Sequence, residues 1–186
     1  MFLAVAAAVV ILSLAIAGIL LWEGQRAARA EAERVTRAVA ETIADSTGVA
    51  DTLARGDRAA ATRLLQPEVE AVTKDAGVDF VTIMDPAGIR ITHPDPARIG
   101  KTYIGTIPTG TATLTEEFTG TLGPSVRTIV PVQSDGVVVG RVSVGVTIGS
   151  ITEALGPRIL VAVAIAVLLA AAGLAGAVYA RRVTRR

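Results

Sequence analysis

Residues 79–93 read DFVTIMDPAGIRITH, and this stretch decides the fold class. In its first half Val81 and Ile83 alternate with the side chains of the opposite face, which is the period of two that is typical of a strand. Residues 85–88, DPAG, indicate a tight turn because Pro comes early and Gly late. Residues 89–93 then return as a second strand, so the stretch predicts a β-hairpin.

Three later segments also predict strands, namely residues 115–118, 126–133 and 137–148. Ser-Asp-Gly at 134–136 is a strong signal for the turn of a hairpin. Residues 95–110 are too rich in Pro and Gly for regular structure, so we expect a long loop there. Together with the first hairpin, these segments predict a five-stranded antiparallel sheet.

A long helix is expected ahead of the sheet. Residues 23–46 are rich in Ala, Glu and Arg, and Val35, Val39 and Ile43 are spaced as one face of a helix. This apolar stripe fits packing into the core of the domain, and it also fits a dimer seam. Three positions leave both interpretations open.

Shorter helices complete the prediction. Gly48 is expected to interrupt the long helix, and Asp57 to cap a second helix in which Pro67 causes a kink or a restart. Residues 151–155 predict a short helix after the sheet. The predicted fold class is therefore α+β.

An uncharged run lies at each end of the chain. Residues 2–22 make up 21 positions and residues 159–180 make up 22, and at 1.5 Å per residue either helix covers the roughly 30 Å hydrocarbon core of a bilayer. Trp22 and Tyr179 lie where interfacial aromatic residues are expected. We therefore expect two transmembrane helices.

The first run also resembles a cleaved signal peptide, with Ala15-Ile16-Ala17 similar to a cleavage site. In a signal peptide, however, an apolar region of about 7–15 residues follows a basic segment. Here the run is longer and no Lys or Arg precedes it, which favours an uncleaved anchor. The absent basic start suggests a sequence that begins inside a longer protein.

The distribution of charge predicts the orientation. All 17 acidic residues fall between Glu23 and Glu153, whereas residues 181–186 read RRVTRR. A basic cluster directly after a span marks the cytoplasmic side. We expect residues 23–158 to form an extracytoplasmic domain, and 181–186 a cytoplasmic stub, of a multi-pass protein in the cell membrane.

The residue inventory argues against an enzyme within this chain. His93 is the only histidine and there is no cysteine, which argues against a zinc cluster and excludes a cysteine nucleophile. Gly100-Lys101 lacks the upstream glycine of a phosphate-binding loop. We identify no catalytic residue, and we expect no cofactor, no metal and no nucleic-acid partner.

Positive side chains gather in one part of the predicted sheet. Arg90, His93, Arg98 and Lys101 fall within twelve positions, and Arg127 lies on a later strand. Arginine offers a planar fork of donors that matches a carboxylate, so the group indicates an anion-binding pocket. The alternative is a set of solvated charges on strand edges. Strict alternation places Arg90 and His93 on opposite faces unless the strand turns directly afterwards.

Three runs carry a family resemblance: VDFVTIMDPAGIRITHPDPARIGKTYIG at 78–105, FTGTLGPSVRTIVPV at 118–132 and VVVGRVSVGVTI at 137–148. Together they resemble the extracytoplasmic PAS-like (single Cache) sensor domain of the citrate and C4-dicarboxylate sensor histidine kinases. The two flanking apolar runs agree with this resemblance.

In that family a pocket holds the carboxylate of a small ligand. The resemblance implies that the ligand-binding residues of this chain are Thr82, Arg90, His93, Thr121, Arg127 and Ser143. Lys101 aligns with a lysine of the family's Ile-Gly-Lys loop, and we include it as a candidate whose role is open.

Two positions depart from the citrate-binding pattern. Thr121 stands where the citrate sensors carry serine, and Ile129 stands where they carry lysine. The dicarboxylate sensors have an apolar residue at the second position. The resemblance therefore implies a C4-dicarboxylate ligand ahead of citrate.

The resemblance also implies a role in signal transduction. The chain would be the sensing part of a two-component system, a homodimer that reaches a response regulator through a cytoplasmic kinase part outside these 186 residues. Ligand binding would shift the last strand and, through it, the second span. A sensor domain of a chemoreceptor or cyclase is an alternative, and so is a membrane assembly protein that senses nothing.

Overall fold

The computed structural model describes the backbone of residues 2–183 and the side chains of residues 15–149, together with side chains at scattered positions nearer the two ends of the chain. The chain divides into two compact units. One unit contains Met1–Ala28 and Thr152–Arg186, and the other contains Arg29–Ile151. We describe each unit by itself.

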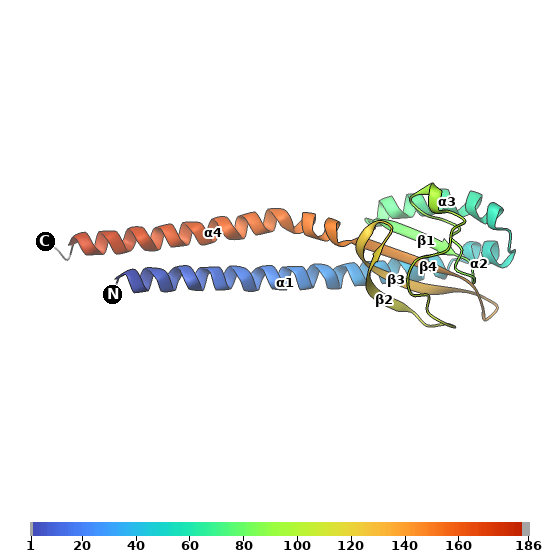
Figure 1. Ribbon diagram of the computed structural model, residues 1–186, viewed down its shortest axis with the longest axis horizontal. Helices are drawn as coiled ribbons and strands as arrows, with labels where there is room; N and C mark the ends of the chain where they lie inside the picture. The colour runs from blue at the N-terminus through green and yellow to red at the C-terminus, as the bar shows by residue number, and fades with distance from the viewer. Residues whose placement is uncertain (1, 184–186) are drawn as a thin grey trace. The chain divides into compact units, whose positions relative to one another are not determined.

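The first unit consists of helical segments. Helix α1 runs over Phe2–Ala44 and helix α4 over Ile148–Val183 (Figure 1). Among the residues described, we find no helix that is both long and apolar enough to cross a membrane. The short helix expected at 151–155 is part of the continuous helix α4. Of the expected basic stub, residues 184–186 lie outside the described residues.

The second unit has helices and a four-stranded antiparallel sheet in the order β1-β4-β3-β2, which confirms the α+β fold class (Figure 1). The sheet follows the end of α1 and two further helices. The elements are α2 Thr47–Ala54, α3 Arg58–Ala76, β1 Phe80–Met84, the 3-10 helix η1 Pro96–Arg98, β2 Leu114–Gly120, β3 Gly123–Ser134 and β4 Val137–Thr147.

The prediction of a fifth strand is wrong in the part of the chain that the structure describes. Residues 89–93 make only isolated bridges, one of which joins Met84 to Arg90. The reason is a side chain that competes with the backbone. The Ile83 N–H donates to Thr92 Oγ1 at 2.8 Å, where a neighbouring strand would offer a carbonyl. Beyond the bridge the Ile91 and Thr92 N–H groups both donate to the Ile83 carbonyl, and no further ladder pair with β1 forms.

Two helix starts lie near positions that the sequence singled out, and one of them carries a side-chain cap. The break after α1 lies at Ser46, the N-cap residue of α2, so the prediction that Gly48 interrupts the helix is wrong. Asp57 caps α3, as predicted, because its carboxylate accepts from the Ala60 N–H at 3.0 Å. Pro67 lies inside α3, and the helix continues through it without a restart.

The apolar stripe of α1 packs into the core. Ile43 is buried, and Val35 and Val39 pack against the same cluster, which favours core packing over a dimer seam. Helices α2 and α3 contact the strands as well. The buried side chains that the sheet gives to this core are Val81, Ile83, Val130, Val132, Val142 and Val144.

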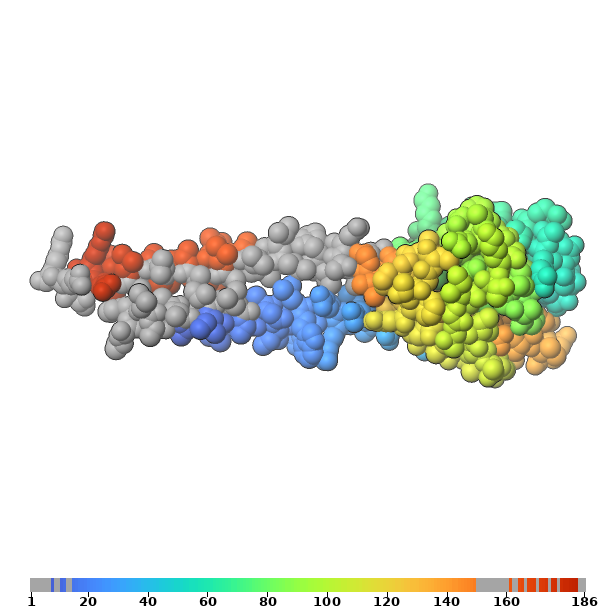
Figure 2. Space-filling view, viewed as in Figure 1, coloured from blue at the N-terminus to red at the C-terminus, as the bar shows by residue number. Residues whose placement is uncertain are grey.

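The opposite face of the sheet is covered by the loop that follows β1. Tyr103 from this loop packs with Met84 and Ile129 in a second buried cluster. Figure 2 shows the loop, in lime green, beside the yellow hairpin of β2 and β3. The space between the loop and this face of the sheet holds the candidate site.

The Phe80 ring lies directly over Gly145, which allows a sharp test of this packing. A Cβ at Gly145 would lie 2.2 Å from Phe80 Cζ, so Gly145→Ala has to displace the ring. We expect the change to lower the free energy of unfolding by about 1–3 kcal/mol, measured by thermal unfolding of the purified chain.

Gly48→Ala is the matched control. Gly48 lies in α2, and a Cβ there meets nothing closer than 3.8 Å. It should leave stability unchanged or raise it by up to about 1 kcal/mol. Equal stability of the two variants would contradict the close packing of Phe80 on Gly145.

Candidate ligand-binding site

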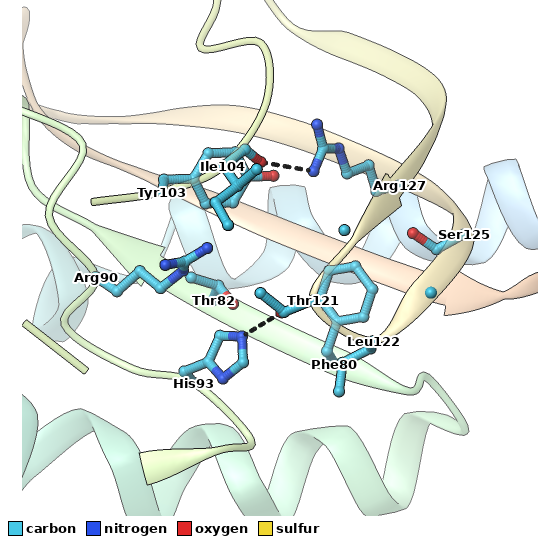
Figure 3. Close-up of a pocket in the computed structure, with 12 residues that line it drawn as sticks. Phe80, Thr82, Arg90, His93, Tyr103, Ile104, Thr121, Leu122, Ser125 and Arg127 are labelled. Atoms are coloured by element: carbon cyan, nitrogen blue, oxygen red, sulfur yellow. Dashed lines mark hydrogen bonds between the residues drawn. The ribbon is translucent and has the colours of Figure 1, made fainter. Parts of the chain in front are cut away.

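A cavity lies between the sheet, the loop after β1 and the turn that joins β2 to β3. Its empty volume is about 350 Å³, including the part open to solvent. The structure brings five of the seven candidate residues to its wall (Figure 3): Thr82, Arg90, His93, Thr121 and Arg127.

The other two candidates lie elsewhere. Ser143 is the β4 partner of Thr82, and its hydroxyl is hydrogen-bonded to the Tyr103 hydroxyl at 2.9 Å. Ser143 therefore does not line the cavity itself but helps to position Tyr103, which does. Lys101 is exposed and does not line the cavity. Its carbonyl accepts from the Arg90 N–H at 3.1 Å, so Lys101 contributes through its backbone.

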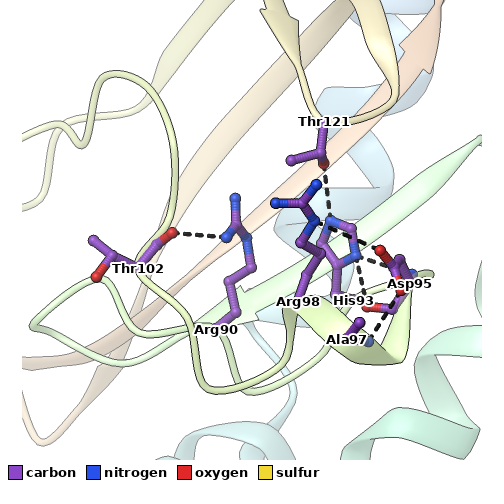
Figure 4. Close-up of polar contacts among 7 residues, drawn as sticks. All are labelled: Arg90, His93, Asp95, Ala97, Arg98, Thr102 and Thr121. Atoms are coloured by element: carbon purple, nitrogen blue, oxygen red, sulfur yellow. Dashed lines mark hydrogen bonds and ion pairs between the residues drawn. The ribbon is translucent and has the colours of Figure 1, made fainter.

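Arg90 is a buried cation without a counter-charge. Its side chain is 4% exposed, and Nη1 donates to the Thr102 carbonyl at 2.7 Å (Figure 4). The Nε–H has no partner, and among the described residues no carboxylate forms an ion pair with Arg90. Burial lowers the pKa of this guanidinium, with smaller contributions in the same direction from Arg98 and Arg127. A buried charge is costly unless it is paired, so this position calls for an anion.

His93 presents a hydrogen-bond donor to the cavity. Nδ1 lies 2.9 Å from the Asp95 N–H and 3.1 Å from the Asp95 carbonyl oxygen, and we assign it as the acceptor of the shorter contact, with the ring proton on Nε2. Nε2 lies 3.3 Å from Thr121 Oγ1 (Figure 4). Burial lowers the pKa of His93 and nearby Arg90 adds to this effect, while Asp95 opposes it. The ring is therefore neutral at pH 7.

The backbone of His93 is anchored to α3. Gln66 accepts from the His93 N–H and donates to its carbonyl, both at 3.0 Å. Because residues 89–93 do not continue as a strand, Arg90 and His93 reach the same cavity. The strict alternation considered from the sequence would have separated them.

Arg127 differs from Arg90 because each of its three guanidinium nitrogens has a partner and one of these partners is a carboxylate. Nε and Nη2 donate to Glu116 Oε1 at 3.1 and 2.5 Å, and Nη1 donates to the Ile104 carbonyl at 3.2 Å. The guanidinium also lies 3.8 Å from the centre of the Phe118 ring. A cation held in this way needs no further anion.

Sequence reasoning missed Tyr103 and Glu116. Tyr103 comes from an irregular loop, where no periodic pattern indicates which side chains turn inward. A signal for Glu116 did exist: Gly120 pairs with Gly123 across a two-residue turn, and counting four places back along each strand pairs Glu116 with Arg127. Among the described residues, no group of His, Asp and Glu could hold a metal ion.

Residues 23–159 match the family described as single cache domain 3. The chain belongs to this family. The match covers the cavity and every strand of the sheet, and it confirms the predicted resemblance to a cache sensor domain.

Similar proteins include sensors of the same general kind. The sensor protein CitS of Halalkalibacterium halodurans is 33% identical over 118 residues, which are 61% of this chain and 22% of CitS. The chain thus spans about a fifth of that relative's length.

Two solved structures share the fold of the cache domain. The E. coli DcuS sensor domain matches with a TM-score of 0.58 and 22% identity, over 69% of this chain and 98% of that one. The sensor domain of the V. cholerae histidine kinase DctB matches with a TM-score of 0.59 and 14% identity. This match covers 75% of this chain and 59% of the DctB chain. At these identities the likeness shows the fold alone.

The lowered pKa of His93 predicts a pH dependence of stability. The unfolded chain binds a proton below about pH 6.5, whereas the folded cache domain keeps His93 neutral to a lower pH. His93 therefore contributes stability that is present above about pH 6.5 and is lost as the pH falls toward the folded pKa.

The measurement is the melting temperature of the wild type and of His93→Gln between about pH 8 and pH 5. As the pH is lowered through the acidic half of this range, the melting temperature of the wild type should fall further than that of the variant. Parallel curves would show that His93 titrates normally in the fold.

Proposed function

We propose that the cache domain is the ligand-sensing part of a two-component sensor histidine kinase and that its cavity binds a small carboxylate. The observation that carries this proposal is the buried Arg90 guanidinium, whose Nε–H has no partner. A carboxylate between the loop and the turn supplies the missing negative charge and an acceptor for this N–H.

The groups around Arg90 are suited to the same ligand. His93 Nε2–H and the hydroxyls of Thr82 and Thr121 are further donors on the cavity wall. They are neutral, so they orient the carboxylate without adding charge. Burial raises the pKa of Tyr103, which therefore stays neutral and does not repel an anion.

Highly charged ligands fit this cavity less well. Ile129 is fully buried under Tyr103, and the Lys101 side chain is exposed, so neither replaces the lysine that the citrate pattern requires. A third carboxylate would lose its hydration without gaining a cation. We therefore propose that a dicarboxylate binds ahead of citrate.

We further propose that residues 2–22 and 159–180 cross the cell membrane, with 23–158 outside and 181–186 in the cytoplasm. The support is the sequence, since both runs are free of charge and the arginine cluster follows the second one. In this arrangement the cavity samples ligands outside the cell.

The proposed signal leaves the domain through β4. This strand ends at Thr147 and continues directly into α4. Asp79 Oδ2 accepts from the Thr147 N–H at 2.6 Å and so ties the start of β1, which carries Thr82 of the cavity, to that junction. A ligand that favours one position of β1 thereby biases α4, and a homodimer would pass the change to a kinase part and its response regulator.

Arg90→Ala tests the binding proposal. The parent chain, purified in mild detergent, should gain melting temperature with millimolar succinate or butyrate, and the variant should lose about 10- to 100-fold in affinity. Without ligand the variant should be no less stable than the parent, because an unpaired buried charge has been removed.

Arg98→Ala is the matched control. Arg98 pairs with Asp95 at 3.5 Å and does not line the cavity, so this variant should bind as the parent does. Undiminished carboxylate binding by Arg90→Ala would place the ligand elsewhere.

The topology has its own test. Compartment-specific reporters inserted at Gly56, which lies in an exposed turn, and fused after residue 186 should report opposite sides of the membrane. Both reporters in one compartment would overturn the proposed pair of spans.

A further inference from the structure

Glu116 places a carboxylate of the protein itself on one of the two cavity arginines. It lies on β2 directly opposite Arg127 on β3, and Oε1 accepts from two nitrogens of that guanidinium. Arg127 is 3% exposed and the Glu116 side chain 21%, so the ion pair is largely withdrawn from water. Charge-assisted pairs of this kind are strong and directional.

The surroundings are shaped to hold Arg127 in this paired position. Phe118 covers one side of the guanidinium, and the backbone of Gly105 comes close to it. A Cβ at Gly105 would lie 2.0 Å from Arg127 Nη2, and this residue has a φ of +115°. A side chain at position 105 would therefore collide with the paired arginine.

The pairing sets the charge that a ligand meets. Arg127 is neutralised by Glu116, Arg98 pairs with Asp95, and the Lys101 side chain lies outside the cavity. His93 is neutral at pH 7. Among the described cavity residues, Arg90 is thus the one cation without a carboxylate partner.

We propose that Glu116 is a specificity-determining residue that makes the cavity select a monocarboxylate over a dicarboxylate. This inference rests on the proposed carboxylate site and narrows its ligand class. The carboxylate binds Arg90, and the remainder of the ligand meets the apolar side chains of Phe80, Ile104 and Leu122 on the wall.

The second carboxylate of a dicarboxylate ligand could occupy either of two positions, and both are unfavourable. It can lie beside the Glu116–Arg127 pair, where it faces a like charge in a poorly hydrated cavity. Alternatively, the second carboxylate displaces Glu116 from Arg127. The protein then loses the Glu116–Arg127 ion pair in exchange for the ion pair between the ligand and Arg127. A monocarboxylate of the same length avoids both costs.

Butyrate and succinate form a suitable pair of probes because both have four carbons and they differ by one carboxylate. We would titrate each into the full chain in detergent by calorimetry. The wild type should bind butyrate about tenfold or more tightly than succinate. Glu116→Gln removes the charge but keeps an oxygen that accepts from Arg127, and it should raise the affinity for succinate by about tenfold while butyrate changes little.

Glu117→Gln is the matched control. Glu117 is the next residue on β2, its side chain is 49% exposed, and it pairs with Arg29 away from the cavity. This variant loses the same charge and should keep the selectivity of the wild type.

Two results would overturn the inference: succinate binding to the wild type as tightly as butyrate, or an unchanged ratio in Glu116→Gln. Either result leaves the carboxylate site intact if Arg90→Ala still abolishes binding of both acids. Failure of both acids to bind the wild type would instead remove the proposed function, and the inference with it.

Discussion

The cavity depends on one constraint, the burial of the Arg90 guanidinium where no carboxylate among the described residues pairs with it. The backbone fixes this residue from both sides, since its N–H donates to the Lys101 carbonyl and its carbonyl accepts from the Gly100 N–H. The side chain thus enters the cavity from a loop that is itself closed by hydrogen bonds. An unpaired buried ion costs several kcal/mol even after relaxation of its surroundings. An anion that binds beside the guanidinium recovers part of this cost.

The two arginines of the cavity belong to different layers and have different tasks. Arg127 rises from the sheet and is satisfied by Glu116, so it gives the hairpin of β2 and β3 a rigid shape. Arg90 and His93 come from the loop and keep donors directed at the cavity. A ligand held by the loop and by Thr121 of the turn joins the two layers. We propose that β1 and the start of α4 transmit such closure, because a ligand shifts an equilibrium only by its differential affinity for the two states.

Much of the fold follows from local sequence. Alternation predicted β1, the Asp-Gly turn predicted the hairpin of β3 and β4, and Asp57 predicted the start of α3, because each depends on residues close in the chain. The false strand at 89–93 had correct alternation, but its bonds to β1 depart from a ladder at Ile83, whose N–H donates to the Thr92 hydroxyl and whose carbonyl accepts from both Ile91 and Thr92. Arg90, His93 and Arg127 were found as a cationic group, but their charge balance was not. That balance depends on the register that brings Glu116 to Arg127, which follows from the two-residue turn between Gly120 and Gly123 and not from the alternation of either strand alone.

The central claim is that a carboxylate ligand binds the free Nε–H of Arg90. The most direct measurement is the ¹⁵N–¹H resonance of that group in the labelled chain, assigned by its loss in Arg90→Lys and followed during titration with butyrate. The account predicts a downfield proton shift that saturates with the calorimetric binding curve, while the Nε–H of Arg98 stays in place. Saturable binding that leaves the Arg90 resonance unmoved would contradict it.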